Sequence, residues 1–88
     1  MTGELFLVLV KESEHHEGRV GITVSGRVGN AVVRNRIRRW VREHVRRDLG
    51  ALPPADVVIV ARQSAGVASH PAVDQDLRTL LVRARGMA

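Results

Sequence analysis

Apolar runs alternate with polar, glycine-containing stretches along this 88-residue chain. The unbroken apolar run at 5–10 is too short for a helix of its own and predicts a strand buried on both faces. The polar stretch 12–18 ends in glycine, which predicts a turn into a second, antiparallel strand at 19–25. Apolar residues occupy every other position of that second strand, so one of its faces should pack on the core.

The second half of the chain predicts two helices separated by a third strand. Asn30 is a suitable N-cap for a helix that continues to about Leu49, with Gly50 just past its end. The continuous apolar run at 56–61 predicts a central strand. Apolar residues at helical spacing predict a second, amphipathic helix over 73–85. The predicted order is β-β-α-β-α within one domain.

The positive charge of the chain is concentrated on the first of these helices. Seven of the 14 basic residues and one of the 9 acidic residues lie between Arg34 and Arg47, so this segment carries +6 and the rest of the chain −1. Charge concentrated in this way indicates a phosphate-rich partner, most simply a nucleic acid. Like charges four residues apart destabilise a helix by roughly a few tenths of a kcal/mol per pair, a cost that a bound partner would explain.

Helical spacing divides the arginines into two stripes beside one apolar face. The apolar face comprises Val33, Ile37, Trp40, Val41 and His44. We expect this face to pack on the sheet, with Trp40 in the core and His44 partly buried. The first stripe comprises Arg34, Arg38 and Arg42, with Asn35 near them. The second stripe comprises Arg36, Arg39 and Arg46. Two stripes fit two phosphate backbones, or one folded RNA held from both sides.

Composition argues against several other classes of protein. The chain has no cysteine, which excludes a disulfide framework and a thiolate metal site and fits a reducing compartment. No apolar run approaches the roughly 20 residues that span a bilayer. The nine carboxylates are scattered, which argues against a protein-only nuclease with clustered metal ligands. His15 and His16 read as part of a solvated turn, because adjacent residues there point apart.

The segment 24–39, VSGRVGNAVVRNRIRR, resembles the signature of the bacterial ribonuclease P protein subunit. The hallmark of that family is an Arg-Asn-Arg at the start of a long basic helix, here Arg34-Asn35-Arg36, after Val-Gly-(Asn/Lys)-Ala-Val. The strand at 56–62 also matches. The resemblance implies an α+β fold, a two-layer sandwich in one RNA-binding domain over 1–88, with a left-handed β-α-β crossover around the basic helix.

The resemblance also implies an activity, a set of partners and a set of binding residues. Family members bind a large catalytic RNA that uses Mg²⁺ to remove the 5′ leader of precursor tRNA. The complex of protein and RNA is a cytoplasmic endonuclease. The protein is then expected to contribute no catalytic residue and no cofactor of its own. Carried over by position, the leader side comprises Arg34, Asn35, Arg38, Arg42 and Phe6. The side facing the RNA subunit comprises Arg36, Arg39, Arg46, Arg27 and Asn30.

Three departures from the family pattern shape these expectations. The family's N-terminal basic segment and short phenylalanine-bearing helix have no counterpart here, Leu9 stands where a tyrosine is frequent, and Gly26 replaces a usual lysine. Without that helix, one face of the first strand would lie uncovered and favour self-association. The alternative function is a stand-alone RNA-binding module or RNA chaperone that keeps the basic helix without serving a nuclease holoenzyme.

Overall fold

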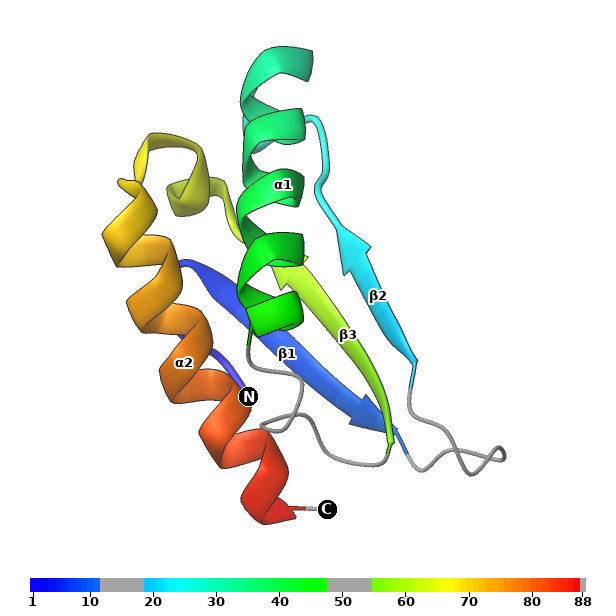
Figure 1. Cartoon of the computed structure of the whole chain (residues 1–88). Helices are drawn as coiled ribbons and strands as arrows, with labels where there is room; N and C mark the ends of the chain where they lie inside the picture. The colour runs from blue at the N-terminus through cyan, green and yellow to red at the C-terminus, as the bar shows by residue number, and fades with distance from the viewer. Residues whose placement is uncertain (12–18, 48–54, 88) are drawn as a thin grey trace.

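The computed structural model describes residues 1–11, 19–47 and 55–87 (Figure 1). Its elements are β1 (Phe6–Lys11), β2 (Val20–Thr23), α1 (Ala31–Arg47), β3 (Asp56–Ala61), the 3-10 helix η2 (Gln63–Val67) and α2 (His70–Met87). The predicted order is therefore confirmed, with a short 3-10 helix added between β3 and α2. The predicted turn at 12–18 and the predicted helix end at Leu49 and Gly50 lie outside the described residues.

The three strands form one mixed sheet in the order β1-β3-β2. The central place predicted for β3 is confirmed. β1 pairs antiparallel with β3, and β2 pairs parallel with β3. β1 and β2 thus run in opposite directions, as predicted, but β3 lies between them. A continuously apolar strand thus takes the position in which both edges are paired, which satisfies its backbone groups most completely.

The connection from β2 through α1 to β3 is a left-handed crossover. With α1 toward the viewer and the parallel strands pointing upward, β3 lies to the left of β2 (Figure 1). Such connections are right-handed in about 98% of cases, so the handedness is a distinctive property of this fold. The crossover implied by the family resemblance is therefore present.

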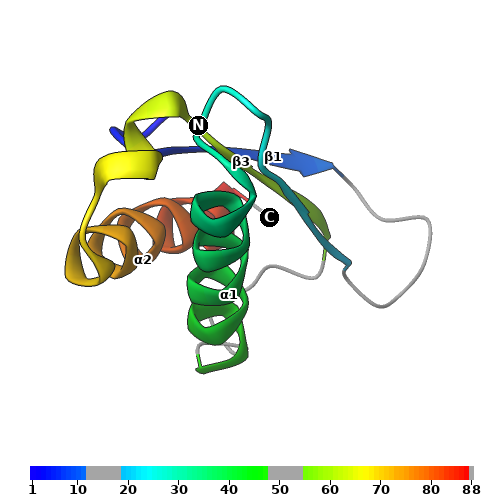
Figure 2. The same ribbon diagram turned by 90° about the horizontal axis from the view of Figure 1, so that it is seen from above.

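The core lies between one face of the sheet and the two helices, which gives a two-layer arrangement (Figure 2). Each layer contributes residues with almost no exposed surface. The largest are Phe6, Val8, Val57 and Ile59 from the sheet, Ile37 and Val41 from α1, and Val73, Leu77, Leu80 and Leu81 from α2. Burial of one such side chain contributes roughly 1.5–3 kcal/mol, so these contacts hold α1 against the sheet.

The prediction that the first strand is buried on both faces is wrong. Phe6 and Val8 have no exposed surface, whereas Leu9, on the opposite face, is 50% exposed. The reason is that α1 and α2 cover the same face of the sheet (Figure 2). Self-association through the other face stays a prediction. Within the described part of the chain, no helix is long and apolar enough to cross a membrane.

The start of the chain is fixed to α2 by a single carboxylate. Asp76 accepts hydrogen bonds from the backbone N–H groups of Glu4, Leu5 and Phe6, at 3.2, 3.2 and 3.0 Å. A Cβ at Gly3 would lie 2.7 Å from both carboxylate oxygens, so glycine is needed for this close approach. The contact joins the entry of β1 to a helix some 70 residues later in the chain.

Candidate nucleic-acid interface

The arginine-bearing helix α1 begins with the cap that the sequence predicts. The Asn30 side-chain oxygen accepts a hydrogen bond from the Val33 backbone N–H at 3.0 Å, and the Asn30 carbonyl accepts one from Arg34 N–H at 2.9 Å. This satisfies a backbone donor that the first turn of the helix would otherwise leave open. His44, Arg46 and Arg47 occupy the last turn, where positive charge complements the helix dipole.

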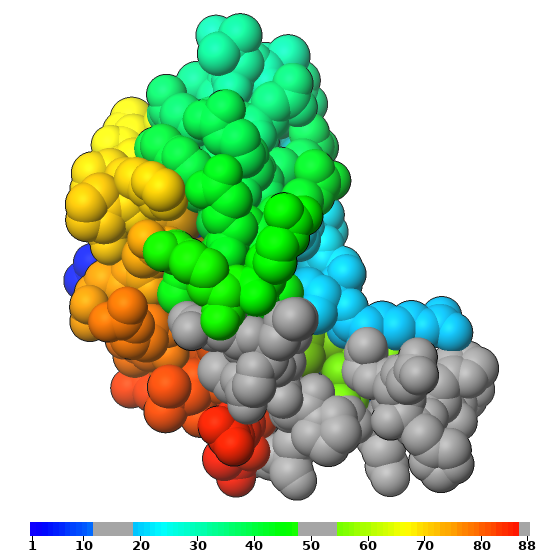
Figure 3. Space-filling view, in the orientation of Figure 1, coloured from blue at the N-terminus to red at the C-terminus, as the bar shows by residue number. Residues whose placement is uncertain are grey.

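The apolar face of α1 packs as its helical spacing predicts. Ile37 and Val41 are fully buried and His44 is 2% exposed, while Val33 and Trp40 are partly buried against the core. This face fixes the rotation of the helix about its axis. The arginines are therefore directed to the two flanks and to the outer surface, where α1 forms a prominent ridge (Figure 3).

One flank of α1 faces β2 and the loop that follows it. Arg38 donates hydrogen bonds to the Val24 carbonyl at 3.4 Å and to the Asn35 side-chain oxygen at 3.3 Å. Further along the same flank, Arg42 lines a hollow with Val20 and Ile22 of β2. Residues of the first stripe thus lie beside the parallel edge strand, and Arg38 is held in place by a backbone acceptor.

The opposite flank of α1 faces η2 and the start of α2. Arg36 donates a hydrogen bond to the Gly66 carbonyl at 3.2 Å, and its guanidinium carbon lies 5.2 Å from the centre of the Trp40 ring. The Trp40 ring stacks on His70 with centroids 4.6 Å apart and planes 3° from parallel. Trp40 therefore joins α1 to α2 at the margin of the core, where it is partly buried, whereas the sequence predicted a core position.

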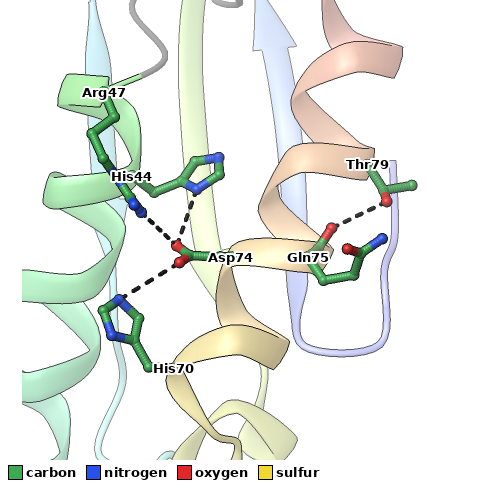
Figure 4. A network of polar contacts seen from close by, with 6 residues as sticks. All are labelled: His44, Arg47, His70, Asp74, Gln75 and Thr79. Atoms are coloured by element: carbon green, nitrogen blue, oxygen red, sulfur yellow. Dashed lines mark hydrogen bonds and ion pairs between the residues drawn. The ribbon is translucent and has the colours of Figure 1, made fainter.

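A carboxylate on α2 ties the two helices together near the end of α1 (Figure 4). Asp74 Oδ1 lies 3.1 Å from His44 Nδ1 and accepts a hydrogen bond from Arg47 at 3.0 Å. Its second oxygen, Oδ2, lies 3.7 Å from His70 Nε2. The prediction of a satisfied His44 is thereby confirmed, and the side chain is more deeply buried than the partial burial expected.

Three cationic or polar neighbours change the pKa of Asp74. Its partial burial alone would raise the pKa of this carboxyl, but the hydrogen bonds from Arg47 and His44 and the nearby charges of Arg47 and His70 outweigh burial and lower the pKa below its usual value of 3.8. Asp74 is therefore ionised at neutral pH and forms an ion pair with Arg47 that links α1 to α2.

The remaining arginines of α1 lack such compensation. Arg47 is the one α1 arginine that forms a salt bridge with another described residue, and it does so with Asp74. Arg39, Arg42 and Arg46 are exposed, and Arg34, Arg36 and Arg38 are partly exposed. Six arginine side chains on one helix thus present positive charge without a carboxylate partner among the described residues, an arrangement that favours a polyanion.

The structure changes the expected site set at two positions, Phe6 and Arg46. Phe6 has no exposed surface because it packs beneath α2 on the helix-covered face of the sheet, so its prediction as a leader-contacting residue is wrong. Arg46 lines the same hollow as Arg42, not the flank of Arg36. Asn35, Arg27 and Asn30 are exposed, with Asn30 also serving as the helix cap.

Several interactions at this interface have no local sequence signal. His44 and Asp74 are 30 positions apart, and Trp40 and His70 are equally distant, so only the docking of α2 against α1 brings each pair together. No group of three or more His, Cys, Asp or Glu side chains that could hold a metal ion occurs among the described residues.

Comparison with known proteins gives consistent matches. The protein-family model described as Ribonuclease P matches residues 1–85. The ribonuclease P protein component of Citrifermentans bemidjiense is 43% identical over 82 residues, which cover 93% of this chain and 71% of that protein. The chain also resembles two solved structures. The RNase P protein of Staphylococcus aureus matches with a TM-score of 0.89 at 30% identity, covering 97% of this chain and 79% of that chain. The RNase P protein of Thermotoga maritima matches with a TM-score of 0.84 at 33% identity, covering 94% of this chain and 80% of that chain.

Proposed function

The chain belongs to the ribonuclease P protein family, the protein component of a tRNA-processing ribonuclease, and on that premise we propose that it binds the RNA subunit of ribonuclease P together with the 5′ leader of precursor tRNA. The observation that carries this proposal is the row of six α1 arginines that have no carboxylate partner among the described residues. The phosphates of an RNA would supply the negative charge that these six arginines do not find within the described part of the protein.

The two flanks of α1 support a division of labour between two RNA strands. We assign Arg34, Asn35 and Arg38 to the leader; Arg38 lies on the β2 side, where it bonds the Val24 carbonyl and the Asn35 side chain. Arg36 and Arg39, with Arg27 and Asn30 near the start of the helix, are assigned to the RNA subunit. Arginine suits both contacts because its planar fork donates two parallel hydrogen bonds to one phosphate and stacks on bases.

In this proposal the protein positions RNA and performs no chemistry itself. The RNA subunit holds the Mg²⁺ ions that cleave the leader, and the protein lowers phosphate repulsion so that substrate and Mg²⁺ bind at lower concentrations. Arg36 and Arg38 are already hydrogen-bonded to the carbonyls of Gly66 and Val24. Because these side chains are fixed before binding, less conformational entropy is lost when RNA binds.

Cleavage of precursor tRNA at low Mg²⁺ tests the proposal. The reaction contains the ribonuclease P RNA of the same organism, with and without the protein. We expect the protein to stimulate cleavage at the correct 5′ position. Binding of the RNA without stimulation would favour the alternative of a stand-alone RNA-binding module or RNA chaperone. Absence of binding would reject both.

A further inference from the structure

A hollow of about 400 Å³ lies between β2 and the C-terminal half of α1. Among the described residues, its apolar lining consists of Val20 and Ile22 from β2 and Val45 from α1, and its charged lining consists of Arg42 and Arg46. Val20 is 37% exposed and Ile22 and Val45 are partly exposed, so an apolar floor is open to a ligand. The volume falls at the lower end of the range of small-molecule pockets, about 300–1,000 Å³.

The two arginines at this hollow are free to act on a ligand. Arg42 and Arg46 are one helical turn apart and exposed, and neither forms a hydrogen bond or salt bridge with another described residue. Among the described residues that line the hollow there is no carboxylate. Helical spacing assigned Arg42 and Arg46 to different stripes. In the structure, both line the hollow that α1 forms with β2.

We propose that the hollow holds one unpaired nucleotide of a bound RNA. Its base or sugar would pack on Val20, Ile22 and Val45, and its flanking phosphates would pair with Arg42 and Arg46. Proteins commonly recognise single-stranded RNA by receiving an unstacked base on an apolar surface while cations hold the backbone. This inference rests on the proposed function, because it presumes that α1 binds RNA, and it makes Arg42 and Arg46 a pair acting on one nucleotide.

A unique thiol tests occupancy of the hollow directly. The natural chain contains no cysteine, so V20C introduces a single reactive group at the floor. The rate of its alkylation by N-ethylmaleimide is measured for the free protein and for the complex with the ribonuclease P RNA subunit. V82C is the control, since Val82 is 61% exposed on α2 and lies outside the hollow. We expect RNA to slow alkylation of V20C by about tenfold or more and to leave V82C unchanged.

A second set of alkylation measurements, with precursor or mature tRNA added, identifies the RNA from which the nucleotide comes. Protection of V20C by the RNA subunit alone assigns the nucleotide to that RNA. Protection that requires precursor tRNA, and is absent with mature tRNA, assigns it to the leader. Both results support the proposal. Unchanged alkylation of V20C in every complex, with binding verified by gel shift, would overturn it.

A larger side chain in the hollow distinguishes the contribution of apolar packing to RNA binding from the contribution of the two arginine charges. V20F adds volume at an exposed edge-strand position where an aromatic residue is well tolerated, and it leaves the net charge unchanged. We expect affinity for RNA to fall about tenfold with an unchanged salt dependence, whereas R42Q and R46Q reduce the salt dependence. Wild-type affinity of V20F, with its fold checked by circular dichroism, would refute the proposal.

Failure of the inference and failure of the proposed function give different results. If the wild-type protein neither binds the RNA subunit nor stimulates cleavage, the proposed function is wrong. If it does both while V20C stays reactive and V20F binds normally, α1 binds RNA elsewhere along its length and the hollow takes no nucleotide.

Discussion

His44 Nδ1 on α1 lies 3.1 Å from Asp74 Oδ1 on α2, and this contact joins the arginine-bearing helix to the rest of the core. His44 is only 2% exposed, so its ring requires a polar partner within the protein. The same Asp74 oxygen accepts a hydrogen bond from Arg47. One carboxylate therefore fixes the end of α1 and, with it, the direction in which the neighbouring arginines point.

Replacing Asp74 with asparagine should lower the stability of the fold. D74N removes the ionised acceptor shared by His44 and Arg47, and hydrogen bonds to charged groups contribute about 1.5–3 kcal/mol. We expect the free energy of unfolding in urea to fall by about 1–3 kcal/mol. E43Q is the matched control, because Glu43 is exposed on α1, and it should change stability by less than about 0.5 kcal/mol. Equal effects of the two variants would contradict a structural role for Asp74.

The lowered pKa of Asp74 predicts a specific acid dependence of stability. Since the folded state holds this pKa below its ordinary value of 3.8, the stabilisation is fully present above pH 3.8 and is lost as the pH falls through the lower folded value. The difference in unfolding free energy between wild type and D74N should therefore shrink as the pH falls below the ordinary pKa of 3.8. Urea titrations at a series of pH values below 4 measure this; a difference that grows as the pH falls through that range would contradict the assignment.

Gly66 should tolerate no side chain. A Cβ there would lie 2.0 Å from the Val28 carbonyl oxygen, so G66A forces the loop before α1 away from η2 and disturbs the carbonyl that holds Arg36. We expect G66A to cost about 1–3 kcal/mol of stability, the usual range for overpacking. At Gly86 no atom lies within 4 Å of an added Cβ, so G86A should leave stability unchanged or raise it by up to about 1 kcal/mol. Thermal unfolding of the pair provides the comparison.

Arg39 should contribute to RNA binding mainly through its charge. It is exposed, so R39Q is expected to leave the fold unchanged while weakening binding of the ribonuclease P RNA. The slope of log K against log salt should decrease in magnitude by about 0.7–0.9 for one lost phosphate contact. R78Q removes an exposed arginine from α2 and should leave the slope at its wild-type value. Identical slopes for R39Q and wild type would remove Arg39 from the interface.

Arg38 should affect recognition of the leader more than binding of the RNA subunit. In the holoenzyme, we expect R38Q to reduce the preference for precursor over mature tRNA by about fivefold to tenfold, or about 1–1.4 kcal/mol. R38K keeps the charge but loses the planar fork that bonds Val24 and Asn35, so its preference should be intermediate. If R38Q weakens binding of both tRNAs equally, Arg38 contacts the RNA subunit or the tRNA body instead.

Much of the fold could be predicted because it depends on short-range periodicity. The run at 56–61 identified the central strand, Asn30 identified the start of α1, and helical spacing identified the buried positions Ile37 and Val41. Two predictions failed for a shared reason. Strand 5–10 was expected to be covered on both faces, and Phe6 was expected to reach RNA, yet apolar pattern alone does not reveal on which face of a sheet the helices pack.

By itself, the sequence determined the three strands and two α-helices, the concentration of charge on one helix and the family, because hydrophobic period, cap residues and a contiguous motif are local properties of the chain. Only the tertiary structure decided which arginines are neutralised and which remain available. Docking of α2 pairs Arg47 with Asp74, η2 holds Arg36, and β2 brings Arg42 and Arg46 to one hollow. Each of these contacts joins residues about 20 or more positions apart, and the free energy that forms them comes from burial of the shared core rather than from any local preference.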